Sequence, residues 1–400
     1  MKRLQHRFIG AAIMISIVTP SLAPSQGVAR QSKPTPPDTT GFSSGSNHWY
    51  NIADEEHVIT PDRVQKRYKS SDVSSIADNI LLYQKTNGGW PKNYDMLAIL
   101  TKEQRDALLI SKAESSTTFD NGATHEQVEY LARAYALTRD PRHKDACLRG
   151  LDFILSAQYP NGGWPQFFPD TSGYRKFITF NDDAMIGVMR VLFDITQGRK
   201  HFAFVDAARR VRIQEAFEKG INAILKCQIV ENGTPTAWCQ QHDHIDFRPQ
   251  YARSYELPST TGGESADVVL FLMEIPKPSS QIVAAIQHAV RWFEKSQIHG
   301  ISVQEVKAPR AQFMFHSADF DRVVVEDPKA PPIWARFYEL GTNRPFFCNR
   351  DGKPVHSLAE VERERRTGYG WYTYEPAKVL QRYPLWQKTW APKARGPENK

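Results

Sequence analysis

Two loops of this chain carry aspartate beside asparagine in nearly the same sequence context. The first, Thr-Phe-Asp-Asn-Gly-Ala-Thr at 118–124, contains Asp120 and Asn121; the second, Thr-Phe-Asn-Asp-Asp-Ala-Met at 179–185, contains Asp182 and Asp183. Asp120 and Asp182, or the threonines Thr118 and Thr179, can cap the helices that follow, because such side chains accept hydrogen bonds from the first helical amides. One carboxylate per helix suffices for a cap, so the surplus indicates a second use. Oxygen-rich clusters of this kind suit a hard cation such as calcium.

Arginines form a second group of candidate residues. They are Arg253, Arg336, Arg350, Arg365 and Arg366. A guanidinium binds a carboxylate through two parallel hydrogen bonds, so several arginines opposite a calcium-binding cluster would suit a polymer of acidic sugars. Surface salt bridges are the alternative explanation. We expect Glu362 and Glu364 to pair with Arg363 and Arg366 rather than with Arg350, which lies in an Asn-Arg-Asp-Gly turn.

Aromatic residues recur beside the aspartate loops. They are Trp90, Tyr94, Trp164, Phe167 and Phe168. Aromatic rings next to an open site can stack on sugar faces, but a tryptophan in a repeated motif more often packs in the core. We therefore expect most of them to serve the fold.

The middle of the chain repeats itself. Gln-Lys-Thr-Asn-Gly-Gly-Trp-Pro at 84–91 returns as Gln-Tyr-Pro-Asn-Gly-Gly-Trp-Pro at 158–165, and a degenerate third copy begins at Gln228 and includes Trp238. Glycine and proline end the preceding helices. Helical spacing of apolar residues follows each aspartate loop, as at Val128, Leu131, Ala132 and Tyr135.

Three helical hairpins in tandem predict a mainly α fold, with inner and outer helices arranged as an (α/α)3 toroid. The loops should gather on one face, with Ser259 and Glu264 beside the two aspartate loops. Residues from about 300 to 390 are less regular, and we expect long loops and short strands there.

The N-terminus has the order of a secretory signal peptide. Basic residues precede an apolar run from Phe8 to Val18, and small residues follow up to Ala29. We expect a cleaved signal peptide at 1–29, a disordered linker at 30–48 rich in Pro, Ser, Thr and Gly, and one catalytic domain at 49–395. The protein is then secreted or periplasmic.

The net charge of +7 is spread along the chain. It is compatible with a polyanionic partner outside the cell and equally with a merely basic surface, and a nucleic-acid role is disfavoured because the chain carries an export signal and no recognised basic reading motif. No association with a membrane is expected. The four cysteines, Cys147, Cys227, Cys239 and Cys348, show no metal-binding spacing. Either a Cys227–Cys239 disulfide or four buried thiols is compatible with this pattern.

Taken together and in order, these motifs resemble the bacterial pectate lyases of polysaccharide lyase family ten. The likeness extends from about Ile76 to Lys388 and includes Ala-Arg-Ser-Tyr-Glu at 252–256, Trp-Ala-Arg-Phe-Tyr-Glu at 334–339 and Asn-Arg-Asp-Gly at 349–352. The resemblance implies an (α/α)3 toroid and calcium-assisted anti β-elimination of polygalacturonate by a protein that we expect to be a monomer.

The resemblance also implies roles for individual residues. Arg350 looks like the base that removes the C5 proton, and Asp182 like the calcium ligand, with Asp183 as the alternative or an additional ligand. Asp120 and Asn121 look like the partner loop in that substrate subsite, and Arg253, Arg336 and Arg365 like contacts to substrate carboxylates. Because Arg365 and Arg366 adjoin, that assignment can slip by one residue.

Two other functions are compatible with the residues. A glycoside hydrolase would use two carboxylates, such as Asp120 and Asp182, and would release saturated sugars without added calcium. A non-catalytic pectin-binding protein would keep the aromatic residues and arginines and turn nothing over.

Overall fold

The computed structural model describes residues 36–37, 59 and 64–391. The chain divides into two compact units, Met1–Thr35 and Pro36–Lys400, and every described residue belongs to the second. The expected signal peptide lies outside the described residues, as does the expected linker except for residues 36 and 37. No helix within the described ranges is both long and apolar enough to cross a bilayer.

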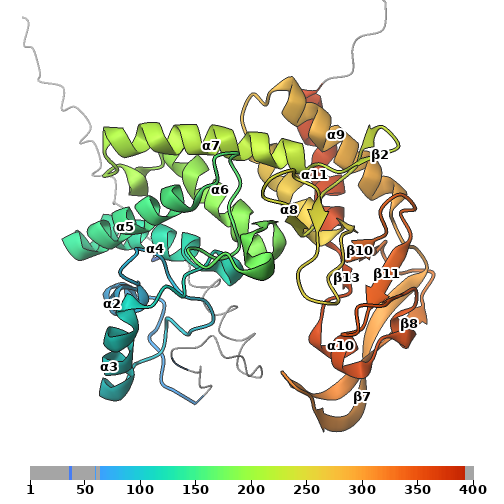
Figure 1. The fold of residues 1–400 in the computed structure, drawn as a ribbon, viewed down its shortest axis with the longest axis horizontal. Coiled ribbons are helices and arrows are strands. Elements are labelled where there is room, and N and C mark those ends of the chain that lie inside the picture. Colours follow the sequence, from blue (N-terminus) through green and yellow to red (C-terminus); the bar gives the residue numbers. More distant parts are fainter. Residues whose placement is uncertain (1–35, 38–58, 60–63, 392–400) are drawn as a thin grey trace, which may run out of the picture. The chain divides into compact units, whose positions relative to one another are not determined.

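Helices dominate the described part of the chain, which confirms the predicted mainly α class (Figure 1). Three hairpins follow one another: α4 (His125–Thr138) with α5 (Pro141–Ala157), α6 (Ala184–Thr196) with α7 (Ala207–Cys227), and α8 (Gly263–Glu274) with α9 (Ser280–Lys295). They are preceded by α2 (Val73–Tyr83) and α3 (Lys102–Ile110) and followed by α10 (Arg363–Gly368) and α11 (Glu375–Trp390).

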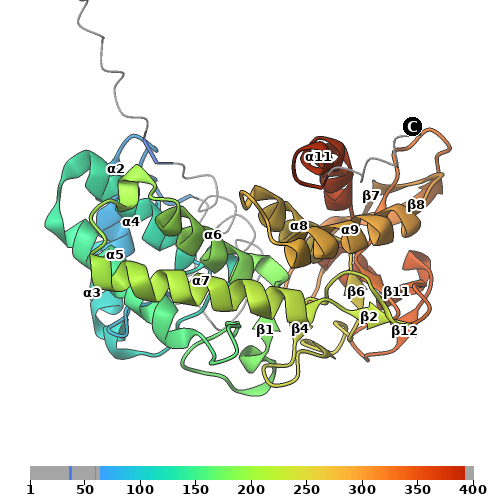
Figure 2. The ribbon, with the colours of Figure 1, turned by 90° about the horizontal axis from the view of Figure 1, so that it is seen from above.

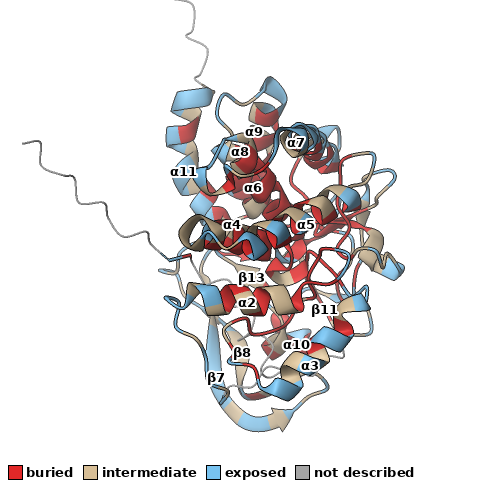
Figure 3. Ribbon diagram, turned by 90° about the vertical axis from the view of Figure 1, so that its left-hand side faces the viewer, coloured by how far each residue is buried: buried red, intermediate tan, exposed pale blue. Residues whose placement is uncertain are grey.

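The hairpins form two layers. Helices α4, α6 and α8 contact one another in order, and so do α5, α7 and α9; α2 packs on α4, and α11 packs on α8 and α9 (Figure 2). Helix α6 buries ten of its thirteen residues, whereas α7 buries six of its twenty-one. A helix buried on most sides belongs to the inner layer, and one with a single apolar stripe to the outer layer, as the burial colours show (Figure 3).

The repeated stop motifs tie each hairpin to the next. Trp90, Trp164 and Trp238 are fully buried, and each indole donates a hydrogen bond of 2.8–2.9 Å to a carbonyl of the preceding helix. Gln84, Gln158 and Gln228 each donate to a carbonyl of the outer helix that follows, at Ala146, Ala216 and Ala285 respectively. The tryptophans therefore serve the core, as expected, and the degenerate third copy has the same structure as the others. Tyr94 and Phe167 are buried as well.

A glycine in this motif allows the close approach of two segments. Gly162 has a φ of +100°, and a Cβ atom there would lie 2.1 Å from the Lys219 carbonyl oxygen of α7. Only glycine fits at this position, because both the backbone angle and the available space exclude a side chain.

Short strands bring distant loops together. A three-stranded sheet joins β1 (Ile178–Thr179), β4 (Gln241–His242) and β5 (Pro249–Gln250), and a four-stranded sheet joins β12 (Pro354–Val355), β11 (Pro345–Cys348), β10 (Phe337–Tyr338) and β6 (Thr260–Thr261) in that order. The remaining pairs are β13 (Tyr372–Thr373) with β9 (Trp334–Ala335), β2 (Val230–Glu231) with β3 (Thr234–Pro235), and β7 (Ile301–Gln312) with β8 (Ser317–Glu326). Pairing of Phe337 with Thr261 places residue 336 beside the start of α8, and pairing of Thr179 with Gln241 places residue 240 beside the second aspartate loop.

The C-terminal region has loops and short strands, as predicted, but the long β7–β8 hairpin was not predicted. A second, smaller core underlies this region, built from aromatic and aliphatic residues that include Tyr255, Phe337, Phe347 and Trp371. All four cysteines are buried free thiols, so the structure has no Cys227–Cys239 disulfide.

Candidate active site

The two aspartate loops adopt the same conformation at the start of two inner helices. Each is a single 3-10 turn, Asp120–Gly122 before α4 and Asn181–Asp183 before α6, and the two turns contact each other. Asn121 and Asp182 occupy the left-handed region with φ of 53° and 49°. Asparagine and aspartate tolerate this region better than most residues, and such backbone conformations concentrate at functional sites.

The capping explanation for these aspartates is wrong. Among the described residues, no side chain forms a capping hydrogen bond at the start of α4 or α6. The left-handed turns separate Asp120 and Asp182 from the first helical amides, so their carboxylates remain available for other contacts.

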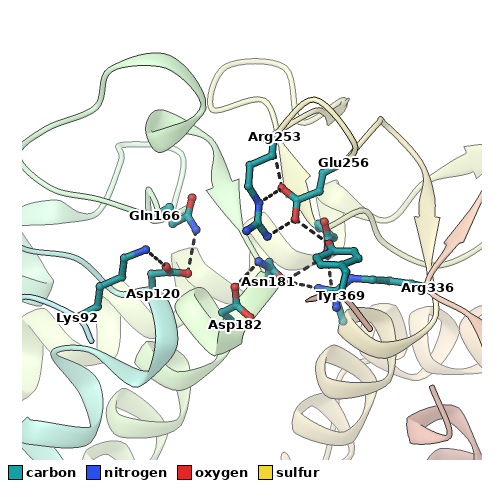
Figure 4. A network of polar contacts seen from close by, with 11 residues as sticks. Lys92, Asp120, Gln166, Asn181, Asp182, Arg253, Glu256, Arg336 and Tyr369 are labelled. Carbon is teal, nitrogen blue, oxygen red and sulfur yellow. Dashed lines mark hydrogen bonds and ion pairs between the residues drawn. The ribbon is translucent and has the colours of Figure 1, made fainter. Parts of the chain in front are cut away.

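Two side chains bind the carboxylate of Asp120 in the first loop. Lys92 Nζ lies 2.8 Å from Asp120 Oδ2, and Gln166 Nε2 donates to Asp120 Oδ1 at 2.9 Å (Figure 4). The neighbouring Asn121 donates from Nδ2 to Asn93 Oδ1 at 3.1 Å. The carboxylate is buried and its orientation is therefore fixed.

Asp182 is exposed to solvent, yet protein surrounds it closely enough to perturb its carboxyl. Desolvation raises its pKa, the negative charge of Asp120 raises it further, and Arg336 and Arg253 oppose the shift, with a net pKa of about 7. One oxygen, Oδ2, accepts a hydrogen bond from Asn181 Nδ2. A carboxylate whose charge is destabilised by a second carboxylate nearby is suited to sharing a cation with it.

The buried residues Asn181, Gln240 and Glu264 and the half-buried Arg336 form a network next to Asp182. Arg336 Nη2 donates to Asn181 Oδ1 and to Glu264 Oε1, both at 2.7 Å, and Gln240 Nε2 donates to the same two oxygens at 3.2 and 2.8 Å. The Arg336 guanidinium carbon lies 4.5 Å from the centre of the Tyr369 ring. This network fixes Arg336 near Asp182.

Arg253 is the most exposed of the paired arginines near Asp182. Its guanidinium makes two hydrogen bonds to buried Glu256, Nε to Oε2 at 2.8 Å and Nη2 to Oε1 at 2.5 Å, while its side chain stays 45% exposed. The Tyr369 hydroxyl also donates to Glu256 Oε1, at 2.7 Å. Desolvation raises the pKa of Glu256, but Arg253 outweighs it and the pKa falls to about 2. Arg253 is thus rigidly held with one face open to a ligand.

Arg350 and Arg365 share a single carboxylate, that of Glu364. Arg350 donates to this carboxylate from Nε at 3.0 Å and from Nη2 at 2.9 Å. Arg365 donates to it from its own Nε and Nη2, both at 2.6 Å. Desolvation raises the pKa of Glu364, yet these two arginines lower it to about 2. The Tyr255 ring lies between the clusters, 5.0 Å from the guanidinium carbon of Arg253 and 5.5 Å from that of Arg350.

The expected salt-bridge partners of Glu364 were wrong. Arg366 pairs with Asp321 of β8, and Arg363 donates to backbone carbonyls of the β7–β8 hairpin. The long hairpin was not predicted from the sequence, so its competing partners could not be anticipated.

Asp183 has different neighbours from Asp182. Desolvation raises its pKa to about 6, and Arg190 opposes the shift. Asp183 acts on Asp267 of α8. Desolvation is the largest cause that raises the pKa of Asp267, and the negative charges of Asp183 and Glu264 raise it further, to about 7. The structure therefore brings Asp120, Asp182, Arg253 and Arg336 together and places Asp183 toward α8.

Three residues that sequence reasoning missed occupy equivalent positions. Lys92, Gln166 and Gln240 each stand two residues after a repeated tryptophan, and each contacts an aspartate-loop residue. Their spacing in the repeats was the signal that could have identified them.

Paired aspartates lie opposite arginines in this site, and the family and structural matches of the chain identify its class as a polysaccharide lyase. The pectic acid lyase family matches residues 84–380, and the chain belongs to that family. The solved family 10 polysaccharide lyase from Cellvibrio cellulosa is 32% identical, with a TM-score of 0.66. An aspartate-to-alanine mutant of that enzyme in complex with trigalacturonic acid has a TM-score of 0.68, covering 78% of this chain and 92% of that one. A search of curated proteins found no match.

Proposed function

We propose that this enzyme is a pectate lyase that cleaves (1→4)-α-D-galacturonan by calcium-assisted anti β-elimination. The observation that carries the proposal is the opposition of Asp120 and Asp182 to Arg253 and Arg336, whose charges act on the Asp182 carboxyl. Such a site complements a polymer that bears one carboxylate on each sugar. The match to an enzyme solved with trigalacturonic acid supports the same substrate.

Elimination breaks the C5–H bond and the C4–O bond and forms a C4–C5 double bond. The proton goes to a base, and the bonding electrons of C4–O leave with the glycosidic oxygen, which is then protonated. Charge develops toward the C6 carboxylate as the proton leaves, so a fixed cation beside that carboxylate lowers the barrier. Arg336 is half-buried, and its hydrogen bonds to Asn181 and Glu264 hold it in place for this role.

The donor set near Asp182 fits calcium. Asp182 and Asp120 supply hard carboxylate oxygens, and the pKa of Asp182 is raised first by desolvation and then by the negative charge of Asp120, both of which a bound cation would offset. We propose Asp182 as the protein ligand; Asp183, beside Arg190 and Asp267, is the less suitable of the two. When bound, calcium would add positive charge next to the substrate carboxylate. Glu129, Asp194 and His201 also lie close enough together to hold an ion, but Arg133 and Arg199 already pair with those carboxylates.

Two arginines are candidates for the base. The family resemblance indicates Arg350, whereas position favours Arg253, because Arg253 acts on the Asp182 carboxyl and exposes 45% of its side chain. Arg350 is engaged with Glu364 and lies beyond the Tyr255 ring. Arginine has a pKa above about 12, so we expect an alkaline activity optimum with either residue. A sharp optimum near pH 5 would contradict an arginine base.

The structural and cellular setting completes the proposal. We propose that the three hairpins close into an (α/α)3 toroid, since neighbouring hairpins contact each other in both layers. We also propose that the protein is exported by its N-terminal signal sequence and acts as a monomer on pectate outside the cytoplasm.

The test is an ultraviolet absorbance assay on polygalacturonate, because the new double bond is conjugated to the carboxylate and absorbs. Comparing Arg253→Lys with Arg350→Lys assigns the base. The variant of the true base loses turnover, and the variant of a binding residue mainly raises KM. Growth of reducing ends without absorbance would indicate a hydrolase, and binding without turnover a pectin-binding protein.

A further inference from the structure

The β7–β8 hairpin is fastened to the part of the site that holds Arg350. A two-stranded hairpin is marginally stable alone, so its position depends on contacts with its surroundings. Arg366 of α10 makes two hydrogen bonds to Asp321, at 2.9 and 2.6 Å, and Arg322 donates back to the Tyr369 carbonyl at 3.1 Å. Arg363 donates to the carbonyls of Pro309 and Phe320. These contacts hold the hairpin beside α10, the helix that carries Glu364 and Arg365 (Figure 1).

The turn of the hairpin is also fixed in place. His316 is buried and its Nε2 lies 2.9 Å from Thr367 Oγ1 of α10, and the Phe313 amide donates to the His316 carbonyl at 2.8 Å. At its tip, Met314 is 75% exposed and Phe315 is only half-buried. The hairpin is therefore fixed to α10, and its tip exposes the apolar side chains of Met314 and Phe315 to solvent.

Phe315 lies directly beside the guanidinium of Arg350. The guanidinium carbon of Arg350 is 4.8 Å from the centre of the Phe315 ring and 5.5 Å from that of Tyr255. Phe313, two residues earlier, instead packs on His316 and lies near Arg363. An aromatic face next to a guanidinium offers one surface for the apolar C–H face of a sugar and one group for its carboxylate.

We propose that Phe315 is a stacking platform for a galacturonate unit whose carboxylate binds Arg350, at a subsite beyond the one formed by Asp182, so that Arg253 and not Arg350 serves as the base. This inference rests on the proposed function, since it assigns a further unit of the same polymer. Arg253 and Arg350 both contact the buried Tyr255 ring, so a unit bound at Arg350 occupies a different position from one bound at Arg253.

The test compares Phe315→Ala, Phe315→Leu and Phe315→Trp with the matched control Phe313→Ala. For Phe315→Ala we expect KM for polygalacturonate to rise about three- to tenfold, with kcat within about twofold of the unsubstituted enzyme. Tryptophan should restore KM, whereas leucine should not, because stacking needs a flat ring rather than an apolar volume. Phe313→Ala should leave KM nearly unchanged.

Calorimetric titration with oligogalacturonates of increasing length, in the presence of a chelator, provides a readout besides turnover. The affinity loss of Phe315→Ala should appear only above a certain chain length. Three results would each overturn the platform. They are an equal KM for Phe315→Ala and the unsubstituted enzyme, a KM restored by Phe315→Leu, and equal losses of affinity for Phe313→Ala and Phe315→Ala. If the unsubstituted enzyme eliminates nothing yet binds long chains through Phe315, the proposed reaction fails while the platform stands.

Discussion

Glu256→Gln should both lower the unfolding free energy and loosen the position of Arg253. Glu256 is buried, and both of its oxygens bind Arg253, so removing its charge leaves that arginine with a weaker partner. The pKa of Glu256 lies at about 2, against an ordinary value of 4.5. At 1.36 kcal/mol for each pKa unit, this difference corresponds to about 3 kcal/mol of unfolding free energy at neutral pH.

The pH dependence of this contribution follows from the lowered pKa. A carboxyl whose pKa is depressed in the folded state stabilises the fold above its unfolded pKa, and the stabilisation is lost as pH falls through the folded value. The difference between Glu256→Gln and the unsubstituted enzyme should therefore be full at pH 7 and shrink from about pH 4.5 toward pH 2.

Urea unfolding followed by fluorescence measures the effect. Glu305→Gln is the matched control, since Glu305 pairs with Arg322 at the surface with 58% of its side chain exposed, and an exposed pair contributes about 0–1 kcal/mol. Equal unfolding free energies for the two variants at pH 7 would refute the reasoning. Turnover of polygalacturonate by Glu256→Gln should also fall, because Arg253 is no longer held in place.

Three further predictions concern single residues. His242 is buried, and desolvation lowers its pKa to about 4, so the fold favours its neutral form. About 3 kcal/mol of unfolding free energy should therefore be lost as pH falls from 6.5 to 4. His242→Asn should flatten that part of the curve of unfolding free energy against pH. Gly162→Ala should lower the unfolding free energy by at least about 2 kcal/mol, because the new Cβ atom meets a backbone carbonyl. Gly198→Ala, whose Cβ atom would have no described atom within 4 Å, should lower the unfolding free energy by only about 1 kcal/mol. Calorimetric melting compares the two variants. Gln240→Ala should reduce kcat/KM about tenfold in the absorbance assay, and it should also lower the melting temperature, because it leaves the buried Asn181 and Glu264 with fewer partners. An unchanged kcat/KM would show that the network does not position the site.

The repeated elements of the fold could be predicted because each carries its own local signal. Gly162 and the buried Trp164 mark a helix end, and the aspartate loops precede inner helices as expected. The β7–β8 hairpin was missed because no residue of β7 is buried, so neither face shows the sustained apolar alternation of a strand, and Pro309 interrupts it.

The residues of the candidate site could be predicted from the sequence, but the carboxylate partner of each arginine could not. Asp120, Asp182 and the arginines stand in recognisable motifs, and the structure brings Asp182 near Arg253 and Arg336. Their carboxylate partners, Glu256 and Glu364, depend on tertiary contacts that no local pattern encodes. The capping hypothesis failed because a left-handed residue turns each aspartate away from its helix.

The most direct test of the account is ultraviolet absorbance during incubation of the purified protein with polygalacturonate at alkaline pH, with calcium or with a chelator. We predict that absorbance rises with calcium, stays flat with the chelator, and stays flat for Asp182→Ala even with calcium. A calcium-independent release of saturated products that depends on Asp120 and Asp182 would contradict the account and identify a hydrolase instead.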